Sequence, residues 1–115
     1  MAGSWELSDQ NPLDQAARQK FRAALSKSTH ILWGRDARRD LDEMPISYMN
    51  VLGAVIDALD HGCTVLNQYL DDGDLAFIVK GLQVCSPPLY FKAKFVTTAA
   101  GERLKVISCH PDRRW

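Results

Sequence analysis

Tyrosine, lysine and histidine side chains near the C-terminus have types and spacings that suit acid–base and phosphate chemistry. Residues 89–95, LYFKAKF, alternate apolar and polar positions, as in a strand that is buried on one face. Such a strand places Tyr90, Lys92 and Lys94 on the opposite face. Two lysines about 7 Å apart on a rigid strand could contact successive RNA phosphates, with Tyr90 stacking or offering its hydroxyl. A solvated face whose lysines discourage edge pairing is the alternative.

His110 follows the last apolar run, VISC, where Pro111 is expected to end a strand. An imidazole titrates near neutral pH and suits general acid or base catalysis, although an ordinary surface histidine fits the same position. The register of the last hairpin decides between these roles. An even loop puts His110 on the face of Phe91, whereas an odd loop or a β-bulge puts it with Tyr90 and the lysines. The sequence leaves both registers open.

One interpretation of the cysteines and histidines in the C-terminal half is a zinc site. These residues are His61, Cys63, Cys85, Cys109 and His110. No C-x-x-C or H-x-x-x-H spacing joins them, and strand neighbours such as Cys109 and His110 point to opposite faces. We therefore predict no metal site and three reduced thiols. The chain has no P-loop, dinucleotide fingerprint, G-x-S-x-G or H-E-x-x-H motif, so no cofactor is expected.

Arginines and acids are mixed in the segment DARRDLDE, which includes Arg38 and Arg39. This pattern indicates a solvated helix that pairs its own charges, with substrate binding by one arginine as the alternative. Three aspartates in DDGD, residues 71–74, fit the chemistry of a tight hairpin turn better than a cation site.

The composition is that of one globular domain: 115 residues, 46% hydrophobic and 24% charged. Fourteen basic and fourteen acidic residues cancel, which argues against a generic binder of the phosphate backbone. No apolar run approaches the ~20 residues of a membrane helix and no leader is apparent, so we predict a cytoplasmic protein without membrane contact. Residues 1–10 are expected to be disordered or tag-derived, and residues 111–115 to form a polar tail.

Helical periodicity dominates residues 11–62. We predict a helix over residues 11–25 capped by Asn11, an extended segment over 29–33, a short helix over 36–44 and a long helix over 47–62. Residues 63–110 change to strand periodicity, and two turn-rich loops, DDGD and AAGE, divide them into two hairpins. The expected fold class is α+β, with the N-terminal helices packed on one face of a four-stranded antiparallel meander and the other face partly open.

The order of these elements resembles the RelE, MqsR and BrnT group of small bacterial toxins. The resemblance lies in DARRDLDEMPIS, an apolar helix that ends at a glycine, a hairpin, and then LYFKAKF and ERLKVISCHP. It covers residues 36–111 and is strongest toward an uncharacterised branch of the group. It implies a RelE-like fold and metal-independent cleavage of RNA by a member of a toxin–antitoxin or mobile-element system. It also implies RNA and a cognate antitoxin or other small protein as partners.

The resemblance assigns roles to individual residues. It implies that Lys92, with Lys94 beside it, helps to bind or cleave RNA, and that His110 stands where several RelE-type members place the acid. Arg38 or Arg39 would lie near the same groove, and Tyr90 could orient the scissile nucleotide.

The chain also departs from the pattern of this group. The histidine of the branch motif is Asp36 here, and the basic residue four positions later is Asp40. Ribosome-dependent members are strongly basic, whereas this chain is neutral. A non-catalytic protein-binding module of the same fold, with a degenerate site, is therefore the alternative function. The oligomeric state stays open.

Overall fold

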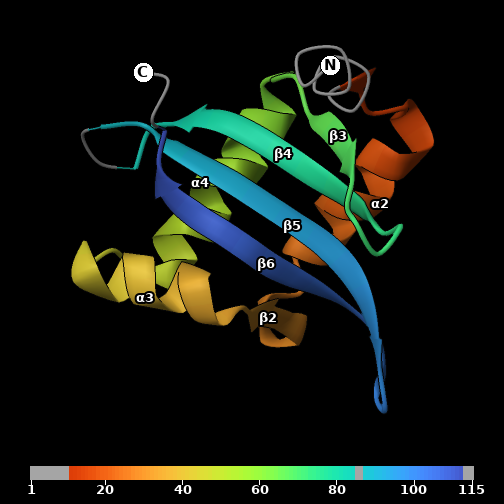
Figure 1. Cartoon of the computed structure of the whole chain (residues 1–115). Helices are drawn as coiled ribbons and strands as arrows, with labels where there is room; N and C mark the ends of the chain where they lie inside the picture. The colour runs from red at the N-terminus through yellow and green to blue at the C-terminus, as the bar shows by residue number, and fades with distance from the viewer. Residues whose placement is uncertain (1–10, 85–86, 113–115) are drawn as a thin grey trace.

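An antiparallel meander of four strands forms the centre of a larger sheet (Figure 1). The computed structural model describes residues 11–84 and 87–112. Within them the strands β3 (Leu66–Tyr69), β4 (Leu75–Leu82), β5 (Leu89–Thr98) and β6 (Gly101–Pro111) pair in sequence order. The predicted meander is confirmed, because period-two alternation and glycine-containing turns specify it locally.

Two short strands extend this sheet to six strands in the order β1-β3-β4-β5-β6-β2. The strand β1 (Asn11–Pro12) pairs antiparallel with β3, and β2 (Ile31–Trp33) pairs parallel with β6. The sheet is therefore mixed and six-stranded, whereas the sequence predicts only its four antiparallel strands. The segment 11–62 also contributes strands as well as helices. The 3₁₀ turn η1 (Ser28–His30) leads into β2.

The first helix begins later than the sequence predicts. Helix α2 (Gln15–Leu25) is capped by Asp14, whose carboxylate accepts a hydrogen bond from the backbone N–H of Ala17 at 2.8 Å. The predicted cap, Asn11, instead belongs to β1 together with Pro12. An aspartate at the N-cap satisfies the open N–H groups of the first turn, and this leaves the preceding residues free to pair with the sheet.

The two other predicted helices are confirmed. Helix α3 (Arg35–Glu43) follows β2, and α4 (Tyr48–Asp60) begins where Ser47 accepts a hydrogen bond from the N–H of Asn50 at 3.4 Å. The chain leaves α4 through Gly62, whose φ of +81° is a left-handed conformation that favours glycine. Over residues 11–84 and 87–112, no helix has both the length and the apolar character needed to span a membrane.

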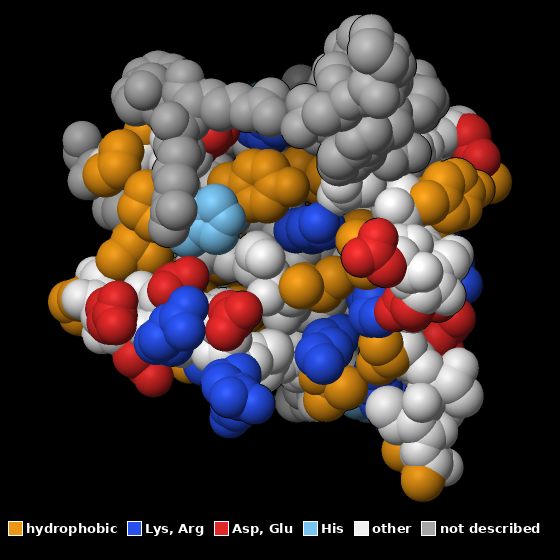
Figure 2. Space-filling view, in the orientation of Figure 1, with side chains coloured by type: hydrophobic (Ala, Val, Ile, Leu, Met, Phe, Trp, Pro, Cys, Tyr) orange, Lys and Arg blue, Asp and Glu red, His pale blue; other side chains and the backbone are white. Residues whose placement is uncertain are grey.

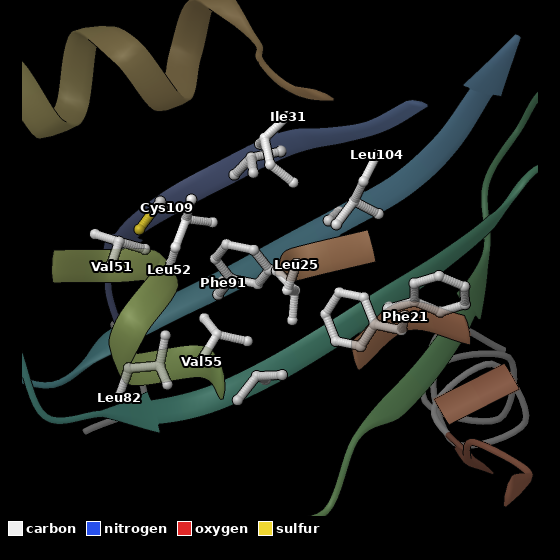
Figure 3. Packing of buried hydrophobic residues seen from close by; sticks show 14 of the residues in the cluster. Phe21, Leu25, Ile31, Val51, Leu52, Val55, Leu82, Phe91, Leu104 and Cys109 are labelled. Carbon is white, nitrogen blue, oxygen red and sulfur yellow. The ribbon is translucent and has the colours of Figure 1, made fainter. Parts of the chain in front are cut away.

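Helices α2 and α4 lie behind the sheet in Figure 1, and α3 lies alongside β6. The core fills the space between the sheet and these helices (Figure 3). Phe21 of α2 packs against Phe77 and Phe91, with ring centroids 5.0 and 6.3 Å apart. Leu89, Phe91 and Ala93 are fully buried, which confirms that the apolar side of residues 89–95 faces the helices.

Arg18 joins α2 to the C-terminal end of α4. Its guanidinium donates hydrogen bonds to the carbonyl oxygens of Cys63 at 2.6 Å and Leu59 at 3.0 Å. Leu59 lies in the last turn of α4, where its carbonyl also accepts from the N–H of Gly62, and Cys63 follows the helix, so Arg18 ties α2 to the end of α4 and to the chain just beyond it.

We expect Arg18→Ala to lower the free energy of unfolding by about 2 kcal/mol, because two charge-assisted hydrogen bonds to backbone carbonyl groups are lost. Urea denaturation monitored by circular dichroism measures the change. Arg22→Ala is the matched control on the same helix, since its ion pair with Asp60 is solvent-exposed and is expected to matter much less. An equal loss in both variants would contradict this assignment.

Candidate functional site

A β-bulge in β6 decides which side chains share the open face of the sheet. Near the turn, Ala93 of β5 lies opposite Val106, but the next pair is Lys92 with Ser108. Ile107 is therefore an extra residue with no partner in β5. One extra residue reverses the alternation of every side chain that follows it in the strand.

Because of this bulge, His110 lies on the same face as the lysines of β5. Tyr90 and His110 are register partners, and their rings are stacked with centroids 5.1 Å apart and planes 12° apart. Cys109 points the other way and is fully buried in the core. The hairpin thus follows the bulged register, one of the two that the sequence leaves open, and the predicted divergence of Cys109 and His110 is confirmed.

Lys92 is a half-buried cation that no residue in the described part of the chain pairs with. Its side chain makes no hydrogen bond or ion pair with any residue in the described part of the chain. Its neighbours across the sheet are Ile78, which is fully buried, and Ser108. Desolvation lowers the pKa of the Lys92 ammonium from the ordinary lysine value. A desolvated cation with open donors is suited to bind an anionic group.

A backbone contact fixes the tautomer of His110. Its Nδ1 lies 2.8 Å from the carbonyl oxygen of Pro111, and a carbonyl can only accept. Nδ1 therefore carries the proton, and in the neutral ring Nε2 keeps its lone pair. The stack with Tyr90 restrains the orientation of the ring. Neutral His110 consequently offers one defined base at Nε2.

Tyr90, Lys92, Ser108 and His110 form what we call the open-face cluster. Lys92 and His110 are diagonal neighbours on adjacent strands, so their Cβ atoms lie about 7 Å apart. The view in Figure 2 looks onto this face of the sheet, where a histidine lies close to apolar and basic side chains. A cation, a hydroxyl and an imidazole at this separation are able to hold a phosphate and move a proton beside it.

Lys94, the second predicted lysine, is held by the β3–β4 loop. Its ammonium lies 3.0 Å from a carboxylate oxygen of Asp72 and 2.9 Å from one of Asp74, and these contacts raise its pKa. The turn role predicted for these aspartates is confirmed, since Asp72 accepts a hydrogen bond from the N–H of Asp74 at 2.9 Å. Their second role, as counterions of Lys94, is not apparent from the turn chemistry alone.

Two residues on this face of the sheet are not among the site residues predicted from the sequence. Ser108 faces Lys92, and Lys105 faces Lys94 across the same strands. Lys105 makes no hydrogen bond or ion pair within residues 11–84 and 87–112. The basic residues in ERLKVIS were a visible signal, but without the bulge position their face could not be assigned.

Arg38 and Arg39 lie on the exposed surface of α3. Arg39 forms ion pairs with Asp36 at 3.5 Å and Asp40 at 3.4 Å, as in the self-paired helix that the sequence favours. Figure 2 shows basic and acidic side chains intermixed over this helix. Within the described residues, no hydrogen bond or ion pair joins either arginine to the open-face cluster.

Among the residues that the structure describes, no three His, Cys, Asp or Glu side chains gather closely enough to hold a metal ion. Cys85, one member of the zinc alternative, lies outside the described residues.

We expect Lys92→Met to raise the free energy of unfolding by about 1 kcal/mol at pH 7, because an apolar chain replaces a desolvated charge. The lowered pKa means that the unfolded chain binds the Lys92 proton more tightly than the folded protein. The destabilisation by the Lys92 charge is therefore present at pH 7. It is relieved as the pH rises through the pKa of Lys92 in the folded protein and then through its pKa in the unfolded chain. Urea denaturation measures it.

Lys94→Met is the matched comparison and is expected to destabilise, because it leaves Asp72 and Asp74 without their counterion. The raised pKa of Lys94 gives the opposite pH dependence: its stabilisation is present at pH 7 and is lost as the pH rises through the folded pKa. Changes of the same sign in both lysine variants would show that the two charges are not in different environments.

Comparisons with protein-family models, curated proteins and solved structures give no match to this chain, so the geometry of the open face is the basis for any functional assignment.

Proposed function

We propose that the protein binds RNA on the open face of its sheet and cleaves it as an endoribonuclease of a bacterial toxin–antitoxin or mobile-element system. The observation that carries the proposal is the unpartnered, desolvated Lys92 beside the stacked pair of Tyr90 and His110. The resemblance of residues 36–111 to the RelE, MqsR and BrnT group supplies the reaction class.

His110 would begin the reaction as the general base. Nε2 takes the proton of a ribose 2′-hydroxyl, and the resulting oxygen attacks the adjacent phosphorus. The bond from the 2′-oxygen to phosphorus forms as the bond from phosphorus to the 5′-oxygen breaks. The product strand then ends in a 2′,3′-cyclic phosphate. The stack with Tyr90 contributes by holding the imidazole in position.

Lys92 would stabilise the negative charge that grows on the phosphorane oxygens. Its lowered pKa also makes its ammonium a stronger acid than an exposed lysine, which suits protonation of the departing 5′-oxygen. Ser108, its register partner, could donate a hydrogen bond to the same phosphate. The cluster thus contains a base, His110, and a cation that can also act as the acid, Lys92, for one transesterification.

A single experiment tests the assignment. Wild-type protein is incubated with a short single-stranded RNA in EDTA, alongside the same strand with 2′-deoxyribose at every position. We expect cleavage of the RNA only, with cyclic-phosphate ends, and growth arrest when the protein is expressed in bacteria. If the wild type neither binds nor cleaves RNA, the proposal is wrong.

The competing function is a non-catalytic module that docks a protein partner on the same face. One observation favours it: Asp72 and Asp74 neutralise Lys94, so the face is less cationic than its sequence indicates. Tight binding of a protein partner on this face, with no affinity for RNA, would select this alternative.

A further inference from the structure

A hollow lies on the helix side of the sheet, between the C-terminal end of α2, η1 and the outer end of the β5–β6 hairpin. Its volume is about 310 Å³. Ala24, Phe95 and Leu104 contribute apolar surface to its wall. Phe95 and Leu104 are register partners, and Leu104 belongs to the core on the helix side of the sheet. The hollow therefore opens away from Lys92 and His110.

Three basic residues from three separate elements line the hollow: Lys27 after α2, His30 of η1 and Arg103 of β6. Within residues 11–84 and 87–112, the side chains of Lys27 and His30 make no hydrogen bond or ion pair. Arg103 donates one hydrogen bond, to the backbone carbonyl of Glu102 at 3.0 Å. These donors are consequently available to a ligand.

The remaining two charges at the hollow neutralise each other. Lys20 lies 3.0 Å from the carboxylate of Glu102, and its ammonium also lies 4.4 Å from the centre of the Phe95 ring. The cation–π contact and the ion pair together fix Lys20 as part of the wall. The one acidic residue of the hollow therefore does not offset Lys27 and Arg103.

We propose that this hollow binds a small organic anion, with its charged group between Lys27, His30 and Arg103 and its apolar part against Ala24 and Leu104. Cationic groups over an apolar wall match a ligand with one charged end and one apolar end. A carboxylate and a phosphate monoester share this chemistry. The proposal does not depend on RNA cleavage, because the hollow and the open-face cluster share no residue.

The test is an NMR titration of the full chain, following backbone amide shifts, with phenyl phosphate, benzoate and inorganic phosphate as three separate probes. We expect saturable shifts at Lys27, His30 and Arg103 for at least one organic probe, with a Kd on the order of 1 mM. Inorganic phosphate is expected to bind at least about threefold more weakly, since it makes no apolar contact. The tighter of phenyl phosphate and benzoate identifies the charged group.

Variants connect the binding to the hollow. Lys27→Ala and Arg103→Ala are each expected to weaken binding about two- to fivefold, as for exposed ion pairs. Arg22→Ala removes a charge from α2 outside the hollow and is expected to leave the affinity unchanged. The proposal is overturned if no organic probe saturates below about 10 mM. It is equally overturned if inorganic phosphate binds as tightly as phenyl phosphate and benzoate, or if the amide shifts occur at Lys92 and His110.

Discussion

Replacing His110 by alanine is expected to reduce the rate of RNA cleavage by about 10²- to 10⁴-fold, the range for loss of a positioned general base. Lys92→Ala is expected to reduce it by about 10²- to 10³-fold, because a cation at the developing phosphorane charge is lost. Single-turnover cleavage of a defined RNA measures both. The loss should fall on the cleavage step for His110 and on both binding and cleavage for Lys92.

Two controls separate catalysis from general effects of mutation. His61→Ala removes an exposed histidine at the end of α4, whose ring contacts Asp57, and is expected to cleave normally. Lys92→Arg keeps a positive charge but supplies a group that cannot act as an acid near neutral pH, so binding should persist while cleavage falls. Full activity of His110→Ala would remove the proposed base and with it the mechanism.

Releasing Lys94 from its loop is expected to strengthen RNA binding. In the variant Asp72→Asn with Asp74→Asn, two carboxylates that now neutralise this lysine become uncharged. We expect about a tenfold rise in affinity at low salt. The slope of log K against log salt should become more negative by about 0.7, as for one additional phosphate contact on a single strand. Fluorescence anisotropy with a labelled RNA measures both quantities.

The matched control is Asp71→Asn, which lies in the same loop and is compared with Asp72→Asn alone. Both variants change the net charge by one unit, but only Asp72 contacts Lys94. A larger gain for Asp72→Asn supports a direct effect of freeing the lysine. Equal gains would show that the loop acts only through its overall negative charge, which would contradict the prediction.

The sequence predicts the elements of this fold that are specified locally. The meander follows from alternation and turn residues, and α4 follows from its apolar stripe, Ser47 and Gly62. The extended segment predicted over residues 29–33 contains β2, but nothing in the sequence indicates its parallel pairing with β6, and β1, two residues long, is too short for periodicity to reveal. Their pairing depends on contacts distant in sequence, such as the hydrogen bond from the N–H of Gly34 to the oxygen of Val106 at 2.8 Å.

The site was predictable in its residue types but not in its geometry. Alternation places Tyr90, Lys92 and Lys94 on one face of β5, and the structure has them there. Whether His110 joins them depends on the extra residue at Ile107, because burial of both Val106 and Cys109 requires a break in strict alternation. The free energy that compensates for such a break comes from tertiary packing, and a local sequence pattern does not indicate it.

The bulge also bears on how this chain should be compared with longer or shorter ones. If Ile107 instead paired with Lys92 in a regular ladder, His110 would pass into the core and Cys109 to the open face, although every residue of the cluster would still be present. A gain of one residue in the turn at Ala99–Ala100 would shift the register throughout β6. In a relative, therefore, the pairing of this hairpin is more informative about the site than the identity of its residues.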